Sequence, residues 1–158
     1  MLKYCIEKWN ENKDLLKREL ETRYGLNLCE YLDLVKLVVR FILNGGETDE
    51  YQEWDESEIT VINDSDYQGT LLFIFHKSTY QPSEYDYLMT YVDYGSCSGC
   101  DTLLSIQGFD NDLLTKLQVA DFMKLCKDIV ANIIKPYNCG WRNEEEFEAV
   151  KFKEGGAE

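Results

Sequence analysis

Residues 85–102 read Y-D-Y-L-M-T-Y-V-D-Y-G-S-C-S-G-C-D-T and predict a β-strand followed by a tight turn. The strand, Tyr85–Tyr94, is rich in tyrosine, and aromatic residues favour extended structure. Because side chains alternate along a strand, its odd-numbered residues share one face and its even-numbered residues share the other. The Gly and Ser residues that follow hold Cys97 and Cys100 in C-x-x-C spacing. This strand and its turn therefore carry most of the functional information in the chain.

Two further strands are predicted before this one. Ile59–Asn63 is a short strand, and Thr70–His76 is almost entirely apolar, which indicates a central strand or one covered on both faces. A segment rich in Asn, Asp and Gly joins the two and is typical of a turn. Short links between three consecutive strands predict an antiparallel meander.

Segments with apolar residues at helical spacing flank the predicted sheet. Leu2–Tyr24 is the first, Asn27–Leu43 the second and Leu113–Ile134 the last. Asn27 and Glu30 form a capping-box-like pattern at the start of the second helix. The order of elements predicts an α+β fold, with two N-terminal helices, a three-stranded antiparallel meander and a C-terminal helix packed on the sheet.

The length of 158 residues fits one domain with a sizeable core. We expect residues 1–141 to form this single α+β domain and residues 142–158 to form a charged, loosely ordered tail. No apolar run approaches the length of a membrane span, and the sequence shows no signal peptide pattern. An intracellular protein without a membrane partner is therefore expected.

The net charge of −14 is concentrated in one part of the chain. Residues 41–115 contain fifteen acidic residues and a single basic one, Lys77, whereas the rest of the chain has fifteen of each sign. One interpretation is simple solvation of the surface. The other is an acidic face that repels nucleic acid and attracts a basic partner, which argues against direct binding of DNA or RNA.

The chain has six cysteines, and without an export signal they do not indicate a disulfide framework. Cys5 and Cys29 lie in the two predicted N-terminal helices, where we expect both to be small core residues. The C-x-x-C pair is different, because two thiolates this close together can bind one soft metal ion.

A structural zinc site normally has four ligands, and the turn supplies two of them. In a meander, Asp64 and Asp66 lie at the same end of the sheet as the cysteines. His76 lies at the far end, which makes it a poor candidate ligand. Further candidates lie on or just beyond the last helix: Cys126, Asp128 and Cys139.

Two alternatives to metal binding remain open for Cys97 and Cys100. The thiols could be free and inert, or they could form a redox pair as in thioredoxin-like proteins. Redox sites of that kind begin a helix in a βαβ unit, whereas a meander is predicted here, and the acidic surroundings oppose thiolate formation. The chain shows no phosphate-binding glycine loop and has one histidine, so we expect a binding protein and not an enzyme.

Three segments resemble a group of small phage-encoded proteins: D-Y-Q-G-T at 66–70, Y-Q-P-S at 80–83 and Y-G-S-C-S-G-C-D-T-L at 94–103. The chain as a whole resembles acidic, zinc-containing anti-CRISPR proteins of the type II-A group. The resemblance implies a structural zinc with Cys97 and Cys100 as ligands. It places Asp66 and Asp128 near the metal, although relatives often carry histidine where this chain has Asp128.

The activity implied by the resemblance is inhibition of a host RNA-guided CRISPR nuclease in the bacterial cytoplasm. Such nucleases hold the guide–target duplex in a basic channel, which an acidic surface could occupy; another basic nucleic-acid-binding protein is also a possible partner. The expected contact residues lie on a loop that we expect the core not to require: Glu50, Glu53, Trp54, Asp55, Glu56 and Glu58. The alternatives are thiol–disulfide activity at the C-x-x-C pair, and a regulatory or structural phage protein with no inhibitory role.

Overall fold

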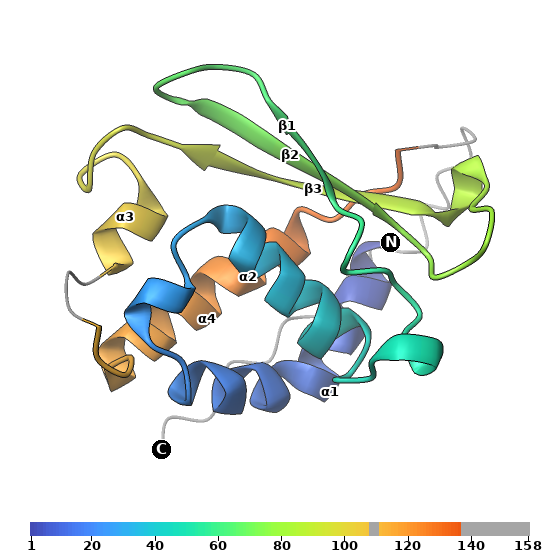
Figure 1. Ribbon diagram of the computed structural model, residues 1–158, viewed down its shortest axis with the longest axis horizontal. Coiled ribbons are helices and arrows are strands. Elements are labelled where there is room, and N and C mark those ends of the chain that lie inside the picture. The colour runs from blue at the N-terminus through green and yellow to red at the C-terminus, as the bar shows by residue number, and fades with distance from the viewer. Residues whose placement is uncertain (108–110, 137–158) are drawn as a thin grey trace.

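The computed structural model describes residues 1–107 and 111–136 and confirms the predicted α+β fold. Helices lie on one side of a three-stranded antiparallel sheet (Figure 1). The α-helices are α1 (Leu2–Glu21), α2 (Tyr31–Leu37), α3 (Thr102–Ile106) and α4 (Lys116–Ala131). The strands are β1 (Thr60–Asn63), β2 (Gly69–His76) and β3 (Tyr87–Tyr94). Short helical turns are η1 (Gly25–Asn27), η2 (Val38–Leu43), η3 (Asp49–Tyr51) and η4 (Glu84–Asp86). The predicted boundary between domain and tail, at 141/142, lies outside the described residues.

The second helix begins at Tyr31, so the prediction that it starts at Asn27 was wrong. The Asn27 side chain accepts a hydrogen bond from the Tyr24 amide at 3.3 Å and caps the short turn η1 instead. The helix itself starts where the Asp33 carboxylate accepts from the Glu30 amide at 3.0 Å. It then widens into the π-helical turn η2 before ending at Asn44.

The sheet has the order β1-β2-β3, as expected for a meander. Gly69 pairs with Tyr94 at one end of β2, and His76 pairs with Tyr87 at the other. This register places the β1–β2 turn beside the cysteine turn and places His76 at the opposite end, as predicted. Strand β3 starts at Tyr87 and not at Tyr85, because the preceding residues form η4.

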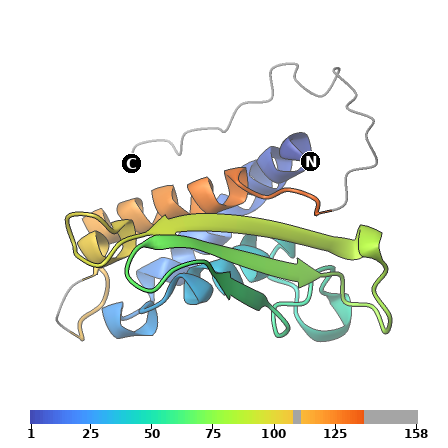
Figure 2. The same cartoon turned by 90° about the horizontal axis from the view of Figure 1, so that it is seen from above.

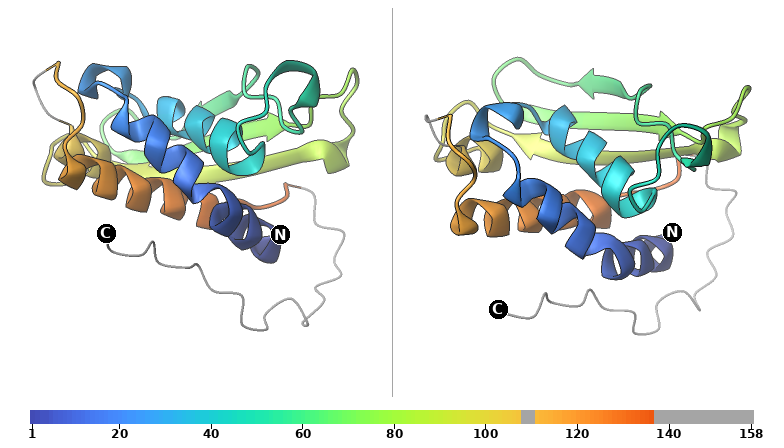
Figure 3. Two further views of the ribbon diagram at one scale, coloured as in Figure 1. Left: turned by 90° about the horizontal axis from the view of Figure 1, so that it is seen from below. Right: turned by 60° about the horizontal axis from the view of Figure 1, so that its bottom comes forward.

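One face of the sheet packs on the helices and forms the core. Leu88, Thr90 and Val92 of β3 point toward α4, and the Thr90 hydroxyl donates to the Ile129 carbonyl at 2.6 Å. Phe73 and Phe75 of β2 are buried on the same face. Beneath them, α1 packs against α4 and η2 on the side away from the sheet (Figure 3). No helix among residues 1–107 and 111–136 has the length and apolar character needed to cross a membrane.

Candidate functional site

The cysteine turn connects the end of β3 to the start of α3. The Cys97 carbonyl accepts hydrogen bonds from the amides of Cys100 at 3.0 Å and Asp101 at 2.9 Å, which closes the turn. Both thiols are exposed, and their sulfur atoms are 2.7 Å apart. A Cβ atom on Gly95 would lie 2.6 Å from the Cys100 carbonyl oxygen, so glycine is required there. The turn therefore presents two sulfurs that can share one metal ion or form a disulfide with small rotations.

Asp101 fixes this turn to the rest of the protein. Its buried carboxylate accepts from the amides of Gly95 and Leu104, both at 2.9 Å, and from the Tyr31 hydroxyl at 3.2 Å. The Tyr31 oxygen in turn accepts from the Leu103 amide at 3.2 Å. Burial and the adjacent carboxylate raise the pKa of Tyr31 to about 12, so this phenol stays protonated and remains a donor. Asp101 could be predicted as a helix cap, whereas its contact with Tyr31 could not.

The pKa values of three cysteine thiols differ. Hydrogen bonding from the Cys97 side chain and backbone lowers the pKa of Cys100 below its usual value. Burial raises the pKa of Cys126 to about 12 and that of Cys5 to about 11. Only deprotonated thiols bind metal or attack disulfides, so the turn is the reactive position among these three. Cys5 is in the core as predicted, but Cys29 is exposed and donates to the Leu26 carbonyl, so its predicted core role was wrong.

The other proposed metal ligands do not gather around the cysteines. Asp66 and Asp128 are exposed, and neither belongs to a group of three potential ligand atoms lying within 4.8 Å of one another. Cys126 is fully buried on α4, and Cys139 lies outside the described residues. The described part of the chain thus supplies two of the four ligands that a structural zinc site normally has.

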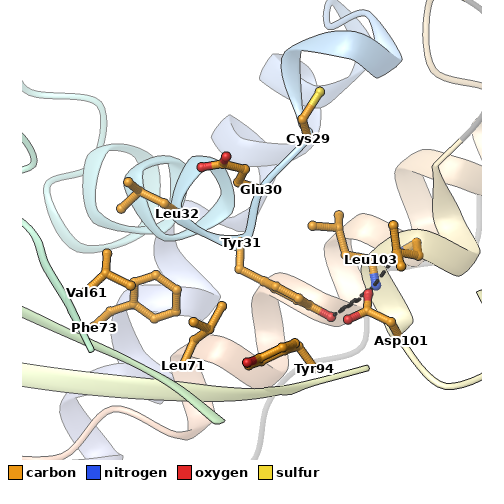
Figure 4. A pocket seen from close by; sticks show the side chains of 11 residues that line it. Cys29, Glu30, Tyr31, Leu32, Val61, Leu71, Phe73, Tyr94, Asp101 and Leu103 are labelled. Carbon is orange, nitrogen blue, oxygen red and sulfur yellow. Dashed lines mark hydrogen bonds between the residues drawn. The ribbon is translucent and has the colours of Figure 1, made fainter. Parts of the chain in front are cut away.

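A pocket of about 470 Å³ lies beside the turn, between the start of α2, the sheet and α3 (Figure 4). Tyr31 and Asp101 form its polar end, where the phenol points at the carboxylate. Cys29, Glu30 and Tyr94 also line it, and the rest of the lining is apolar: Leu32, Val61, Leu71, Phe73, Leu103 and Leu104. No pattern in the sequence indicates this pocket, because its walls come from segments far apart in the chain.

The second face of the sheet carries no helix among the described residues, and Figure 2 looks onto it. The register puts Ile62, Leu72 and Tyr91 in one row across the three strands, with Ile74 and Met89 in the next row. Ile62 is 48% exposed and Tyr91 is 40% exposed. We call these five residues the open face. The solvent-facing side of an antiparallel sheet normally carries polar side chains, so this apolar face is a candidate binding surface.

Acidic side chains lie on the open face and at both ends of it. Asp93 lies on it and accepts from the Thr70 hydroxyl at 2.9 Å. Exposed acids also stand at both ends of the sheet, with Asp64 and Asp66 in the β1–β2 turn and Glu58 and Glu84 at the opposite end. The combination of an apolar centre and an acidic rim is complementary to a basic protein surface.

Residues 47–58 were predicted to form a partner-contact loop that the core does not need. Part of this loop is buried in the core. Trp54 is 4% exposed, and its indole nitrogen donates to the Tyr4 hydroxyl at 2.9 Å. Glu56 pairs with Arg40 of η2. These two residues therefore do not form a free contact surface, and the premise that the core does not need this loop was wrong. Glu50, Glu53 and Glu58 are exposed, and Asp55 is half-buried.

Glu58 and Asp55 meet His76 at the end of β2. His76 Nε2 lies 3.2 Å from Glu58 Oε2, and the imidazole ring packs edge-on against Tyr87 at a centroid distance of 5.5 Å. Partial burial alone would lower the pKa of His76. The hydrogen bond to the Lys77 carbonyl and the two carboxylates outweigh burial and raise that pKa above its usual value.

Comparison with known proteins gives no relative: no family model matches the chain, and no curated protein or solved structure matches it significantly.

Proposed function

We propose that this chain is an acidic binding protein that attaches to a basic nucleic-acid-handling protein and keeps nucleic acid away from it. The observation that carries the proposal is the open face, an apolar sheet surface inside a segment with fifteen acids and one base. Apolar contact would supply affinity at the centre, and the acidic rim would select a basic partner and speed the encounter.

The partner we propose is an RNA-guided CRISPR nuclease of the host, which the chain would inhibit. Such an enzyme holds its guide–target duplex by the backbone, in a channel lined with basic residues. A protein surface that carries carboxylates in place of phosphates could occupy part of that channel. The resemblance of residues 66–103 to phage proteins supports this choice of partner, and the proposed location is accordingly the cytoplasm of an infected bacterium.

Lysine substitutions on the open face test this assignment. We expect Ile62→Lys/Tyr91→Lys to weaken partner binding roughly 100-fold, because two positive charges would enter the apolar centre of the contact. Both side chains are exposed, so stability should change by less than about 1 kcal/mol. The measurement is equilibrium binding to the guide-loaded nuclease by biolayer interferometry.

A matched control separates the surface from the overall charge. Leu26→Lys/Leu117→Lys introduces the same two charges at leucines that are 54% and 72% exposed in the helical layer. This variant should bind within about threefold of the wild type, a loss that reflects long-range charge alone. Equal losses in the two double variants would show that net charge, and not the open face, determines binding.

Zinc at the cysteine turn is part of the same proposal, because two thiolates in C-x-x-C spacing bind this ion. We expect metal analysis of the untagged protein by mass spectrometry to find about one more zinc per chain than in Cys97→Ala/Cys100→Ala. The variant should also unfold at lower temperature if the ion stabilises the turn. Equal zinc contents in the wild type and the double variant would show that the cysteine turn does not bind zinc.

Thiol–disulfide exchange is the second candidate function, favoured by the lowered pKa of the exposed Cys100. In that reaction the Cys97 and Cys100 thiols would form a disulfide, and their two electrons and two protons would reduce a substrate disulfide to two thiols. Reduction of a test disulfide by the metal-free protein, lost in Cys97→Ser, would favour this candidate over zinc binding.

A further inference from the structure

Asp55, Glu58 and His76 form the one group in residues 1–107 and 111–136 whose three potential ligand atoms lie within 4.8 Å of one another. It lies at the end of the sheet opposite the cysteine turn, so it is separate from the proposed zinc site. The neutral imidazole and two carboxylates are ligands of borderline divalent metals such as Zn²⁺, whereas Mg²⁺ and Ca²⁺ prefer sites made of oxygen alone.

The backbone brings these three residues together at rigid positions. His76 is the last residue of β2, and its carbonyl accepts from the Asp55 amide at 2.8 Å. Trp54, next to Asp55, is anchored in the core. Glu58 precedes β1 by two residues, and its side chain is 73% exposed, which leaves it free to adjust. The site therefore combines two fixed ligands with one that can move onto an ion.

The orientation of the His76 ring is the observation that points to a metal. Its Nδ1 atom lies 2.7 Å from the Lys77 carbonyl oxygen, and a carbonyl can only accept, so Nδ1 carries the proton. Nε2 faces Glu58 Oε2 at 3.2 Å, where the protonated ring donates to the carboxylate and the neutral ring offers its lone pair, so a metal ion bound there would take the place of the Nε2 proton. Histidines that bind metals almost always donate their second ring nitrogen to a carbonyl or carboxylate in this way.

The distances fit an ion with modest rearrangement. A metal that binds nitrogen and oxygen at about 2.1 Å holds neighbouring ligand atoms roughly 3–3.5 Å apart. Nε2 of His76 and Oε2 of Glu58 already lie 3.2 Å apart. Asp55 is held nearby by its own hydrogen bonds to Ser57, at 2.8 Å from the amide and 2.6 Å from the hydroxyl.

We infer that Asp55, Glu58 and His76 form a binding site for a divalent metal ion of the Zn²⁺ type, bound through His76 Nε2 and the two carboxylates. Three protein ligands leave at least one coordination position for water or for a side chain of a bound partner. The site does not depend on the proposed function or on the cysteine turn.

Nuclear magnetic resonance of the His76 ring tests this inference site by site. His76 is the single histidine of the chain, so untagged protein gives one set of ring ¹⁵N signals. We expect Zn²⁺, added to several equivalents so that the cysteine turn is also satisfied, to shift the Nε2 signal while Nδ1 keeps its proton. The ring nitrogens remaining unchanged at saturating Zn²⁺ would overturn the site.

Two single variants decide whether the Glu58 carboxylate takes part. Glu58→Gln should weaken Zn²⁺ binding at His76 roughly tenfold or more, since it replaces a charged ligand. Glu50→Gln removes the same charge from an exposed residue of the same loop and should change the affinity less than about twofold. Equal affinities in Glu58→Gln and the wild type would contradict the three-residue site.

Discussion

Replacing Asp101 with alanine is expected to lower the free energy of unfolding by about 3–5 kcal/mol. The substitution removes the cap of α3, which alone contributes about 1 kcal/mol. It also leaves the buried Tyr31 hydroxyl and the partly buried Gly95 amide without their acceptor, at about 1–3 kcal/mol for a fully buried group and less for a partly buried one. Urea unfolding followed by far-UV circular dichroism measures the loss.

The partners of Asp101 provide the controls for this effect. Asp101→Asn keeps one side-chain acceptor and should cost less than the alanine change. Tyr31→Phe removes the hydroxyl that links Asp101 to the Leu103 amide. Because the two residues share one network, the double variant should lose less than the sum of the single losses. A loss below about 1 kcal/mol for Asp101→Ala would show that the cysteine turn is not held by this carboxylate.

Trp54→Ala is expected to cost about 3–5 kcal/mol, the range for truncating a large buried aromatic residue. The indole packs edge-on against Phe75 at a centroid distance of 5.9 Å. The Trp54 backbone also exchanges two hydrogen bonds with the Asn44 side chain, at 2.8 and 2.9 Å. Truncation would leave a cavity where loop 47–58 meets the core. Thermal unfolding of the variant and the wild type gives the comparison.

Tyr51→Ala is the matched control, because Tyr51 is an aromatic residue of the same loop that is 79% exposed. We expect its stability to stay within about 0.5 kcal/mol of the wild type. If Trp54→Ala were equally mild, the loop would be independent of the core, as the sequence alone suggested, and Trp54 would again be a candidate contact residue.

The sequence was sufficient to predict the fold because each helix and strand has its own pattern of apolar residues. The apolar run of β2, the alternation of β3 and the helical spacing in α1 and α4 each describe one element. The prediction placed the start of α2 too early, because two polar side chains that can cap a helix follow one another within a few residues. Asn27 and Asp33 both accept backbone hydrogen bonds, but only the second begins the helix. The exposure of Cys29 follows from the same error, since it precedes the helix.

The candidate site depends on contacts that no local pattern encodes. Tyr31 and Asp101 are 70 positions apart, and Trp54 reaches Tyr4 across 50 positions. The burial of Trp54 could not be read from an acidic loop without periodicity. The metal ligands proposed from spacing and resemblance, Asp66 and Asp128, require side-chain positions that strand order alone does not determine.

The open face connects the fold to the proposed function. Alternation along β3 could predict that its odd-numbered residues share a face, but not which face the helices would cover. The helices cover the even-numbered residues, so Tyr91 and Met89 remain on the second side with Leu72 and Ile74 of β2. An apolar surface within the acidic segment is therefore the feature on which the proposed partner binding depends.

Binding of the purified chain to a guide-loaded type II-A CRISPR nuclease, measured at low and at high salt, tests whether the acidic rim and open face attach to a basic partner. We predict a complex at about 50 mM salt whose affinity falls roughly tenfold or more by about 500 mM, because salt screens the attraction between an acidic rim and a basic surface. Cleavage of target DNA should be inhibited in proportion to complex formation. Absence of a complex at low salt, or an affinity that does not change with salt, would show that this protein does not inhibit the nuclease through its acidic surface.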